Sequence, residues 1–454
     1  MGGKQGIKDS RFVIEHADDP EYSLITRSSD GQVLFLANML SKMKRGTKLG
    51  SHIAEVHNGS SLFTGDAGQG ESNIRRWLIE SDWLEAIVAL PLNMFYNTGI
   101  ATYIWVLSNR KPDHRAGRVQ LIDATQRFKP LRKNLGKKNC ELSEADIQRI
   151  CDTFLAFEET EQSKIFPNAA FGYWKIRVER PLYLHSELTR KAIESLRFAS
   201  GDPELRAELY DRIGESLFED FDSARSKVKA ILDQWNGGED DDEGEDGATT
   251  KKSIPDKKRK KLLDSKTWER DGRLVEVASA LRKELGDRLF EDHNEFRAQV
   301  EAALHKLDLK LAASDRKILL RAASSTVETA PPVIKKIHKK GTAADPLRGL
   351  FDSKIDGKPA VVEYEPDSDL RDTEQVPLLE EGGIEAFLRR EVLPHAADAW
   401  YVPDSVKTGY EVSFTRYFYK PQPLRTLQEI RADILALEKE TEGLLGEIIG
   451  SENR

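Results

Sequence analysis

Residues 29–109 of this 454-residue chain read SDGQVLFLANMLSKMKRGTKLGSHIAEVHNGSSLFTGDAGQGESNIRRWLIESDWLEAIVALPLNMFYNTGIATYIWVLSN. Apolar residues recur there at helical spacing in two segments and form short continuous runs in others. The pattern predicts, in order, a helix, a strand, a glycine-rich loop, a helix, a strand, an aromatic turn and a strand, at 30–46, 52–56, 62–71, 71–81, 83–90, 91–99 and 102–107. Strands that alternate with helices in this way indicate an α/β fold.

The composition describes a charge-rich chain without a membrane-spanning segment. Charged residues make up 32% of the chain, and its net charge is −8. This charge argues against a protein that coats nucleic acid by itself, but a DNA partner could be reached through a local basic face or another subunit. No apolar run approaches the roughly 18 residues that a transmembrane helix needs. Cys140 and Cys151 lack metal-ligand spacing, so we expect a reduced, cytoplasmic protein.

The glycine-rich loop is the first candidate for a ligand contact. Its glycines, Gly65, Gly68 and Gly70, can take backbone angles closed to other residues and allow a ligand to approach closely. The same glycines also suit a plain connector. The loop has neither the spacing of a dinucleotide-binding turn after a first strand nor the Gly-Lys-Ser/Thr ending of a Walker phosphate loop.

Two aromatic residues, Phe95 and Tyr96, occupy the turn between the last two strands of the stretch. From the residues alone they are either core side chains or members of a binding site. No catalytic or metal-binding constellation accompanies them, because the nine histidines are scattered and motifs such as H-E-x-x-H, C-x-x-C and G-x-S-x-G are absent. We therefore predict no catalytic residue, no cofactor-binding residue and no metal ligand in this chain.

The rest of the chain divides into blocks of different composition. After a first region at 1–140, we expect a mostly helical region, a charged linker, a helical region, a second linker, a mixed region and a C-terminal helix, at 141–235, 236–262, 263–329, 330–345, 346–425 and 426–450. The first linker joins an acidic run to a basic run, a pattern typical of solvated spacers. Its basic half could also contact DNA phosphate.

The C-terminal helix carries the second strong pattern. Thr426 and Glu429 have the T-x-x-E spacing of a capping box. Apolar residues then alternate by three and four along a heptad seam, at Leu427, Ile430, Ile434, Leu437, Leu444 and Ile448. Such a coiled-coil-type seam either folds back on its own domain or packs against a partner helix bundle.

Four segments carry a resemblance to a known family: SDGQVLFLANMLSKMK at 29–44, the stretch 53–111, DLRDTEQVPL at 369–378 and FTRYFYKPQPLRTLQEI at 414–430. They closely resemble the modification subunit of type I restriction–modification systems, an N6-adenine-specific DNA methyltransferase. The resemblance extends from about Arg11 to the C-terminal helix. It implies a Rossmann-like sheet of seven strands that binds S-adenosylmethionine. This chain would supply the last three strands, with an antiparallel hairpin at one edge.

Two motifs of that family are absent. Family members carry a glycine-containing cofactor turn of the F-x-G-x-G kind and an N-P-P-F/Y tetrapeptide whose Asn, Pro carbonyl and aromatic ring hold the target adenine. Neither occurs in these 454 residues. We therefore expect a chain that starts inside the methyltransferase domain. The apolar parallel strand at 52–56 would then lie unpaired at an open sheet edge, and residues 1–125 would not form a self-sufficient domain.

The resemblance also implies roles for residues of the stretch. The turn between the last two strands would line the pocket for the flipped base, with Phe95 as the first candidate for adenine contact, followed by Tyr96 and Asn97. The loop after the strand at 52–56 would lie near DNA or the substrate pocket, through Asn58, Gly59, Thr64, Gly65, Asp66, Gly68 and Gly70. The C-terminal seam would pack on the helical spacer of the specificity subunit.

These expectations lead to three hypotheses. In the first, the chain is a truncated or split subunit that is inactive alone. It would contribute to S-adenosylmethionine-dependent N6-adenine methylation of double-stranded DNA only with the missing N-terminal half and a specificity subunit, in a complex that also holds a restriction subunit. In the second, it is a catalytically inactive binding module that docks on the specificity subunit. In the third, it is a decayed gene product.

Overall fold

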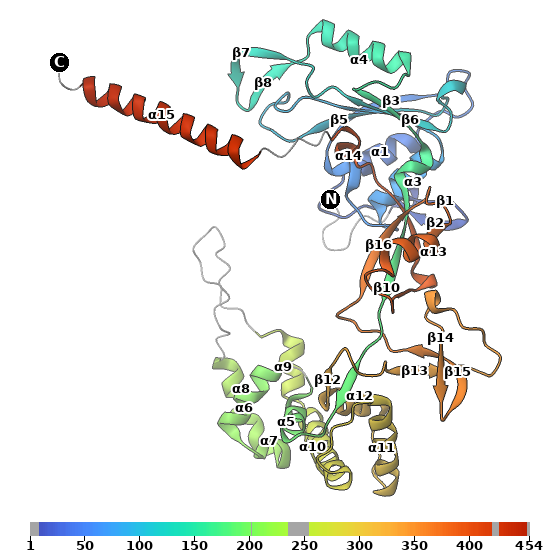
Figure 1. Ribbon diagram of the computed structural model, residues 1–454, viewed down its shortest axis with the longest axis vertical. Coiled ribbons are helices and arrows are strands. Elements are labelled where there is room, and N and C mark those ends of the chain that lie inside the picture. Colours follow the sequence, from blue (N-terminus) through green and yellow to red (C-terminus); the bar gives the residue numbers. More distant parts are fainter. Residues whose placement is uncertain (1–8, 201, 235–253, 420–425, 452–454) are drawn as a thin grey trace. The chain divides into compact units, whose positions relative to one another are not determined.

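A computed structural model describes residues 9–200, 202–234, 254–419 and 426–451 (Figure 1). The chain forms two compact units. Unit 1 comprises Met1–Lys175, Gln375–Gly383 and Lys407–Arg454, and unit 2 comprises Ile176–Glu374 and Ile384–Val406. In the part of the chain that the structure describes, no helix is long and apolar enough to cross a membrane.

A five-stranded sheet forms the centre of unit 1. Its strands are β3 (His52–Asn58), β4 (Leu84–Ala89), β5 (Thr102–Ser108), β6 (Arg118–Asp123) and β9 (Ser163–Pro167). Their order is β3-β5-β4-β6-β9. β4 and β6 run parallel, and the other neighbouring pairs run antiparallel. Because β3 and β4 are both antiparallel to β5, the strands β3, β4 and β6 all point in the same direction.

Helices cover both faces of this sheet (Figure 1). α1 (Gln32–Ser41) and α3 (Gly70–Glu80) share one apolar core with the sheet. α4 (Glu144–Ala156) packs on the other face, against a smaller cluster that contains Val88 and Ile122. All six residues of β4 are therefore buried, which explains the continuous apolar run from which this strand was predicted.

Several short elements and the long C-terminal helix complete unit 1. They are η2 (Ser10–Phe12), β1 (Val13–His16), β2 (Asp19–Ser23), α2 (Ser60–Phe63), η3 (Asp113–Arg115), β7 (Lys129–Leu135), β8 (Lys138–Glu141), η4 (Asn168–Phe171), β18 (Lys407–Tyr410), α14 (Phe414–Phe418) and α15 (Leu427–Ser451). β10 (Gly172–Glu179) begins in this unit, where it pairs with β18. Phe171, Tyr410 and Phe414 lie in the same core as α1 and α3, so residues beyond 125 complete that core.

The sequence predicted that this chain supplies three strands of the sheet, with an antiparallel hairpin at one edge. The structure differs from that prediction. The sheet has five strands, and β5 lies inside it, between β3 and β4. The expected end of this region at residue 140 was too early, because β9 pairs with β6. β3 does lie at a sheet edge. However, it is antiparallel to β5, its one neighbour among the described residues, and its burial alternates, so it is not a covered apolar strand.

Helices form the first part of unit 2. They are α5 (Arg190–Ser195), η5 (Leu196–Phe198), α6 (Pro203–Ile213), α7 (Ser216–Glu219), α8 (Phe221–Gln234), α9 (Asp256–Leu262), α10 (Ser265–Leu285), α11 (His293–Lys306) and α12 (Ala313–Ala322). Two apolar clusters hold them together. One surrounds Trp268, and the other surrounds Phe296.

Small sheets and short helices form the remainder of unit 2. The strands are β11 (Leu184–Ser186), β12 (Ser324–Thr326), β13 (Ile334–Ile337), β14 (Phe351–Ile355), β15 (Lys358–Tyr364) and β17 (Trp400–Tyr401), and β16 (Asp372–Pro377) ends in unit 1. The short helices are η6 (Pro346–Arg348), α13 (Gly383–Phe387), η7 (Leu388–Val392) and η8 (Pro403–Ser405). β11 pairs with β12, and β13, β15 and β14 form a three-stranded sheet.

Three of the expected blocks differ from this structure. The block at 141–235 contains the strands β9, β10 and β11 besides its helices. The basic half of the expected linker at 236–262 forms α9, which is held by burial of Leu262 and by an ion pair of 3.0 Å between Lys258 and Asp202. Residues 235–253 lie outside the described part. The expected linker at 330–345 contains β13, because its isoleucines pair with β15.

His293 is a buried histidine of unit 2, with 6% of its surface exposed. Its Nδ1 lies 2.8 Å from the hydroxyl of Ser186. Burial, followed by the charges of Arg297 and Arg321, lowers the pKa of His293 from 6.5 to about 4. The imidazole is therefore neutral in the folded chain at neutral pH.

From the lowered pKa of His293 we predict that the folded chain loses stability in mild acid. Because its folded-state pKa lies below 6.5, the unfolded chain takes up the proton first, so stability is full above that pH and falls as the pH falls toward 4. Between pH 7 and pH 5 we expect a loss of about 2 kcal/mol in the free energy of unfolding of unit 2. Urea unfolding at both pH values should show this extra loss in the parent chain and not in His293→Gln. Equal losses in the two chains would contradict the assignment.

Candidate functional site

The carboxyl ends of three strands of unit 1 meet at one edge of its sheet. β3 ends at Asn58, β4 at Ala89 and β6 at Asp123. The first two ends lie close together because both meet Thr102, the first residue of β5. Thr102 lies opposite Asn58 in the pairing of β3 with β5, and its carbonyl accepts from the N–H of Leu90, just after β4, at 2.9 Å. In open α/β sheets ligands bind outside the carboxyl ends of the strands. This edge is therefore the candidate site.

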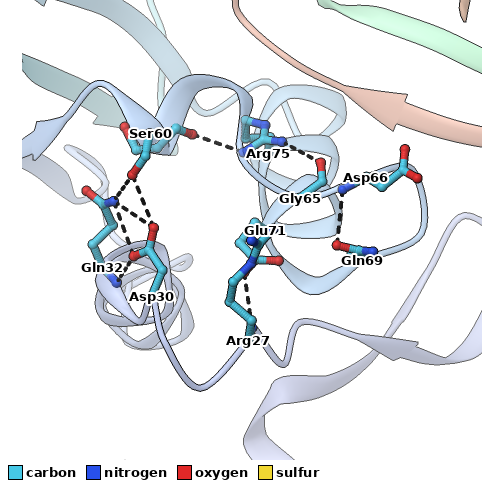
Figure 2. Close-up of polar contacts among 10 residues, drawn as sticks. Arg27, Asp30, Gln32, Ser60, Gly65, Asp66, Gln69, Glu71 and Arg75 are labelled. Carbon is cyan, nitrogen blue, oxygen red and sulfur yellow. Dashed lines mark hydrogen bonds and ion pairs between the residues drawn. The ribbon is translucent and has the colours of Figure 1, made fainter. Parts of the chain in front are cut away.

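A polar network fixes the start of the loop that follows β3 (Figure 2). Gln32 of α1 donates from Nε2 to Asn58 Oδ1 at 2.8 Å and to Ser60 Oγ at 2.6 Å. The N–H of Asn58 donates back to Gln32 Oε1 at 3.2 Å. Asp30 accepts from the hydroxyl of Ser60 at 3.1 Å. These groups bind one another, so the network positions the loop.

Arg75 of α3 ties the same loop to a distant segment of the chain. Its side chain is fully buried, and its guanidinium donates to the carbonyls of Tyr410 at 2.6 Å, Ser61 at 3.0 Å and Gly65 at 3.3 Å. Burial lowers the pKa of Arg75 to about 10, which leaves the group charged at neutral pH. Figure 2 shows this side chain pointing at the loop.

The glycines of the loop are explained by contacts within the protein. A Cβ at Gly70 would lie 2.0 Å from the carbonyl oxygen of Ile25. Gly65 has a φ of +88°, and a Cβ there would lie 2.7 Å from Cβ of Glu71. Glu71 is itself buried and accepts from the N–H of Arg27 at 3.0 Å. The space beside these two glycines is therefore filled by the chain.

The tip of the loop is more open. Asp66 forms an ion pair with Lys175, and its N–H donates to Gln69 Oε1 at 3.2 Å. Gly68 is exposed, and its φ of +81° is one that glycine takes without strain. Phe63, at the end of α2, is 60% exposed. The sequence did not single out this phenylalanine, since one exposed aromatic on a short helix leaves no periodic pattern.

The aromatic turn after β4 has one half-buried and one exposed ring. Phe95 packs against the cluster that contains Val88 and Ile122. Tyr96 is 63% exposed. Asn97 is also exposed and has a φ of +56°. Phe95 therefore contributes to the core with part of its surface, and its role in binding a base stays a prediction.

A hairpin that the sequence did not predict packs on this turn. It consists of β7 and β8. The N–H of Asn139 donates to the carbonyl of Asn93 at 3.1 Å, and the Cys140 thiol donates to the carbonyl of Leu92 at 3.2 Å. The ammonium of Lys138 lies 5.2 Å from the ring centroid of Tyr96. Proline and several lysines hid this pair of strands, because both residue types are depleted in strands.

Asp123 and Tyr103 complete the edge. Asp123 accepts from the hydroxyl of Thr125 at 2.6 Å. Burial, followed by the charge of Asp123, raises the pKa of Tyr103, so the phenol stays protonated. Among the described residues no group of three or more His, Cys, Asp or Glu side chains could hold a metal ion. The site therefore presents aromatic rings, hydroxyls, amides and carboxylates that are hydrogen-bonded within the protein.

The predicted site residues divide into two sets. The first set lies at the end of β3 and in the segment that follows it: Asn58, Gly59, Thr64, Gly65, Asp66, Gly68 and Gly70. The second set, Phe95–Asn97, lies in the turn after β4. The structure brings the start of the first segment close to the residues that follow the turn, since the N–H of Gly59 donates to the carbonyl of Ala101 at 3.1 Å. Gln32, Asp30 and Arg75 were missed. Each sits on or beside a helix, where a polar residue is ordinarily read as part of the solvated face.

The C-terminal helix α15 was predicted correctly as a helix with a capping box. Glu429 accepts from the N–H of Thr426 at 2.7 Å, and the N–H of Glu429 donates to Thr426 Oγ1 at 3.2 Å. Four residues of the predicted seam have exposed side chains: Leu427, Ile430, Ile434 and Leu437. Leu444 and Ile448 fall within the same helix, but their side chains lie outside the described set.

Comparison with known proteins places this edge in a family. Residues 4–171 match the family model described as N-6 DNA Methylase. We call residues 4–171 the methylase region, after the family model that they match. The resemblance to a type I restriction–modification methylase subunit is thereby confirmed for these residues.

Two curated methylase subunits are similar to part of this chain, and a solved structure is similar at lower identity. The MjaIX type I restriction enzyme methylase subunit of Methanocaldococcus jannaschii is 31% identical over 171 residues, which are 37% of this chain and 29% of the relative. The HindI methylase subunit of Haemophilus influenzae is 30% identical over 150 residues, 32% of this chain and 30% of the relative. The methyltransferase subunit structure from Streptococcus thermophilus has a TM-score of 0.28 and 23% identity, covering 32% of this chain and 29% of that one. This chain thus spans less than a third of the length of these proteins.

S-adenosylmethionine, which the resemblance implies, does not fit the residues present. The F-x-G-x-G cofactor turn is absent from the sequence, and the space beside Gly70 and Gly65 is filled by Ile25 and Glu71. The carboxylates at the edge are hydrogen-bonded within the protein, Asp30 to Ser60 and Asp123 to Thr125. Among the described residues, Gly65 and Gly70 therefore leave no open space in which a cofactor could be cradled.

This misfit makes a direct prediction. Titration of S-adenosylmethionine into the purified chain, followed by calorimetry, should show no one-to-one binding. Adding a polypeptide segment that carries the F-x-G-x-G turn and the N-P-P-F/Y tetrapeptide should produce it. Micromolar one-to-one binding by the chain alone would mean that a complete cofactor site exists here.

Proposed function

We propose that the methylase region supplies the target-base side of an S-adenosylmethionine-dependent N6-adenine DNA methyltransferase within a type I restriction–modification assembly. The observation that carries the proposal is the position of the aromatic turn. It lies at the carboxyl edge of the sheet, between β4 and β5, in a region that matches the N-6 DNA methylase family. An adenine extruded from the duplex would stack there on Phe95 and Tyr96.

The catalytic tetrapeptide has to come from elsewhere. These 454 residues contain no Asn-Pro-Pro sequence, and the groups at the edge are amides, hydroxyls and a carboxylate already bonded to protein. We therefore propose that methylation requires a segment that carries N-P-P-F/Y, together with a specificity subunit that selects the DNA sequence. On this basis the chain alone is inactive.

The base-pocket role of Phe95 can be measured in a reconstituted complex. Supplying the N-P-P-F/Y segment and the specificity subunit should restore adenine methylation. Because stacking of a base on an aromatic ring contributes roughly 1–3 kcal/mol, Phe95→Ala should then lower kcat/KM for duplex DNA about tenfold or more. Ile100→Ala, in the same connection between β4 and β5 and 56% exposed, is the control. If Phe95→Ala methylates as well as the parent, the stacking role is wrong.

A docking function is supported by a separate observation, the exposed apolar seam of α15. Leu427, Ile434 and Leu437 are 86%, 62% and 67% exposed, a pattern typical of a helix that packs against a partner bundle. We propose the specificity subunit as that partner. The same surface would serve a non-catalytic binding module, so docking and methylation are separable.

Replacing Ile434 and Leu437 with Asp should abolish copurification with the specificity subunit, since two charges would be buried in an apolar interface. The charge-matched control is Ala432→Asp with Ala436→Asp. These two alanines lie on the face of α15 opposite the seam. Both pairs of positions are exposed in this chain. Retained binding by the seam variant, or equal loss in the control, would rule out docking through the seam.

A further inference from the structure

The hairpin β7–β8 gathers positive charge on an otherwise acidic chain. Between Arg127 and Glu141 the sequence holds six basic residues and one acidic residue, whereas the whole chain has a net charge of −8. Four of the basic side chains, Lys129, Arg132, Lys133 and Lys137, are exposed. Within the described residues none of these four is held in an ion pair. Unpaired cations that gather on one short element are typical of a surface that binds a polyanion.

Exposed apolar side chains lie among these cations. Phe128 is 42% exposed and Leu135 is 47% exposed. Tyr96, on the turn beneath the hairpin, is 63% exposed and lies against the ammonium of Lys138. Surfaces that bind nucleic acids commonly combine basic residues with exposed aromatic rings. The cations bind phosphates, and the rings contact bases or sugars.

The hairpin is attached firmly to the candidate site. Two hydrogen bonds, from Asn139 to the carbonyl of Asn93 and from Cys140 to that of Leu92, join β8 to the aromatic turn. A Cβ at Gly136, in the tip of the hairpin, would lie 2.9 Å from Oδ1 of Asn97. A duplex held by the hairpin would therefore stand beside Phe95 and Tyr96.

We propose that the hairpin Lys129–Glu141 is a DNA-backbone clamp that binds the phosphates of duplex DNA next to the extruded base. A two-stranded ribbon fits the major groove of B-form DNA. Its contacts are made by flexible cations to phosphates, and such contacts fix position without reading sequence. The clamp rests on the proposed function, in which sequence selection belongs to another subunit.

The test is the salt dependence of DNA binding by the full chain. Fluorescence anisotropy with a labelled duplex of about 30 base pairs, at about 50–200 mM salt, gives the slope of log affinity against log salt. The variant Arg132→Ala with Lys133→Ala should reduce the size of that slope by about 1.8, or about 0.9 for each lost phosphate contact. Affinity at the lowest salt should fall about tenfold.

The matched control replaces two lysines that precede β3, away from the strand end that leads into the candidate site. Lys44 and Lys48 precede that strand and are exposed, so Lys44→Ala with Lys48→Ala changes the net charge equally and should leave the slope unchanged. Thermal melting verifies that both variants fold. An unchanged slope in the hairpin variant, an equal change in the control, or no salt-dependent binding by the parent at about 50 mM salt would overturn the clamp.

Two further outcomes separate the clamp from its alternatives. Loss of specificity-subunit copurification in the hairpin variant, with DNA binding intact, would identify a protein interface and overturn the proposal. Anisotropy requires no methyl transfer. A complex that fails to methylate DNA while its binding still depends on the hairpin would therefore overturn the proposed function and support the clamp.

Discussion

Unit 1 depends on the burial of one charged side chain. Arg75 has no access to solvent, and a buried cation is costly unless its donors are bonded. Its guanidinium meets this need with carbonyls of Ser61, Gly65 and Tyr410. The first two lie in the loop after β3, and the third lies in a segment more than 300 residues later in the sequence. One side chain therefore fixes the loop and also holds the returning C-terminal segment against the core.

This arrangement separates support from contact at the candidate site. Gln32, Asp30, Glu71 and Arg75 hold the loop from within, and their polar atoms bond to other parts of the protein. The exposed surface is left to Tyr96, Phe63 and the hairpin. A loop whose interior is held by hydrogen bonds and whose outer surface is exposed is suited to binding a large, flat substrate in one orientation. The entropic cost of ordering the loop on binding is then small.

The sequence predicted those parts of unit 1 whose pattern is local. The strand β4 was recognised because both its faces are covered, so five of its six residues are apolar. The capping box at Thr426 also appears as predicted, since a short local spacing suffices to define it. Long-range partners left no such signal. The bond from Arg75 to Tyr410, the placement of β5 inside the sheet and the pairing of β13 with β15 each depend on segments that are distant in sequence. Gly65 and Gly70 are explained by protein atoms that pack against them, which the sequence did not reveal, and the role of the loop near DNA or substrate stays a prediction.

The charge of the hairpin also bears on how the molecule would meet a partner in solution. Six basic residues occupy fifteen positions of a chain whose total charge is negative, so the molecule is electrically lopsided. A polyanion approaching at random would be repelled by most of the surface and attracted over one small region. Such asymmetry rotates the two molecules before they touch and shortens the search among unproductive encounters. Its reach is set by the ionic atmosphere, about 8–10 Å at physiological salt. The hairpin would thus orient the aromatic turn toward DNA before any base leaves the duplex.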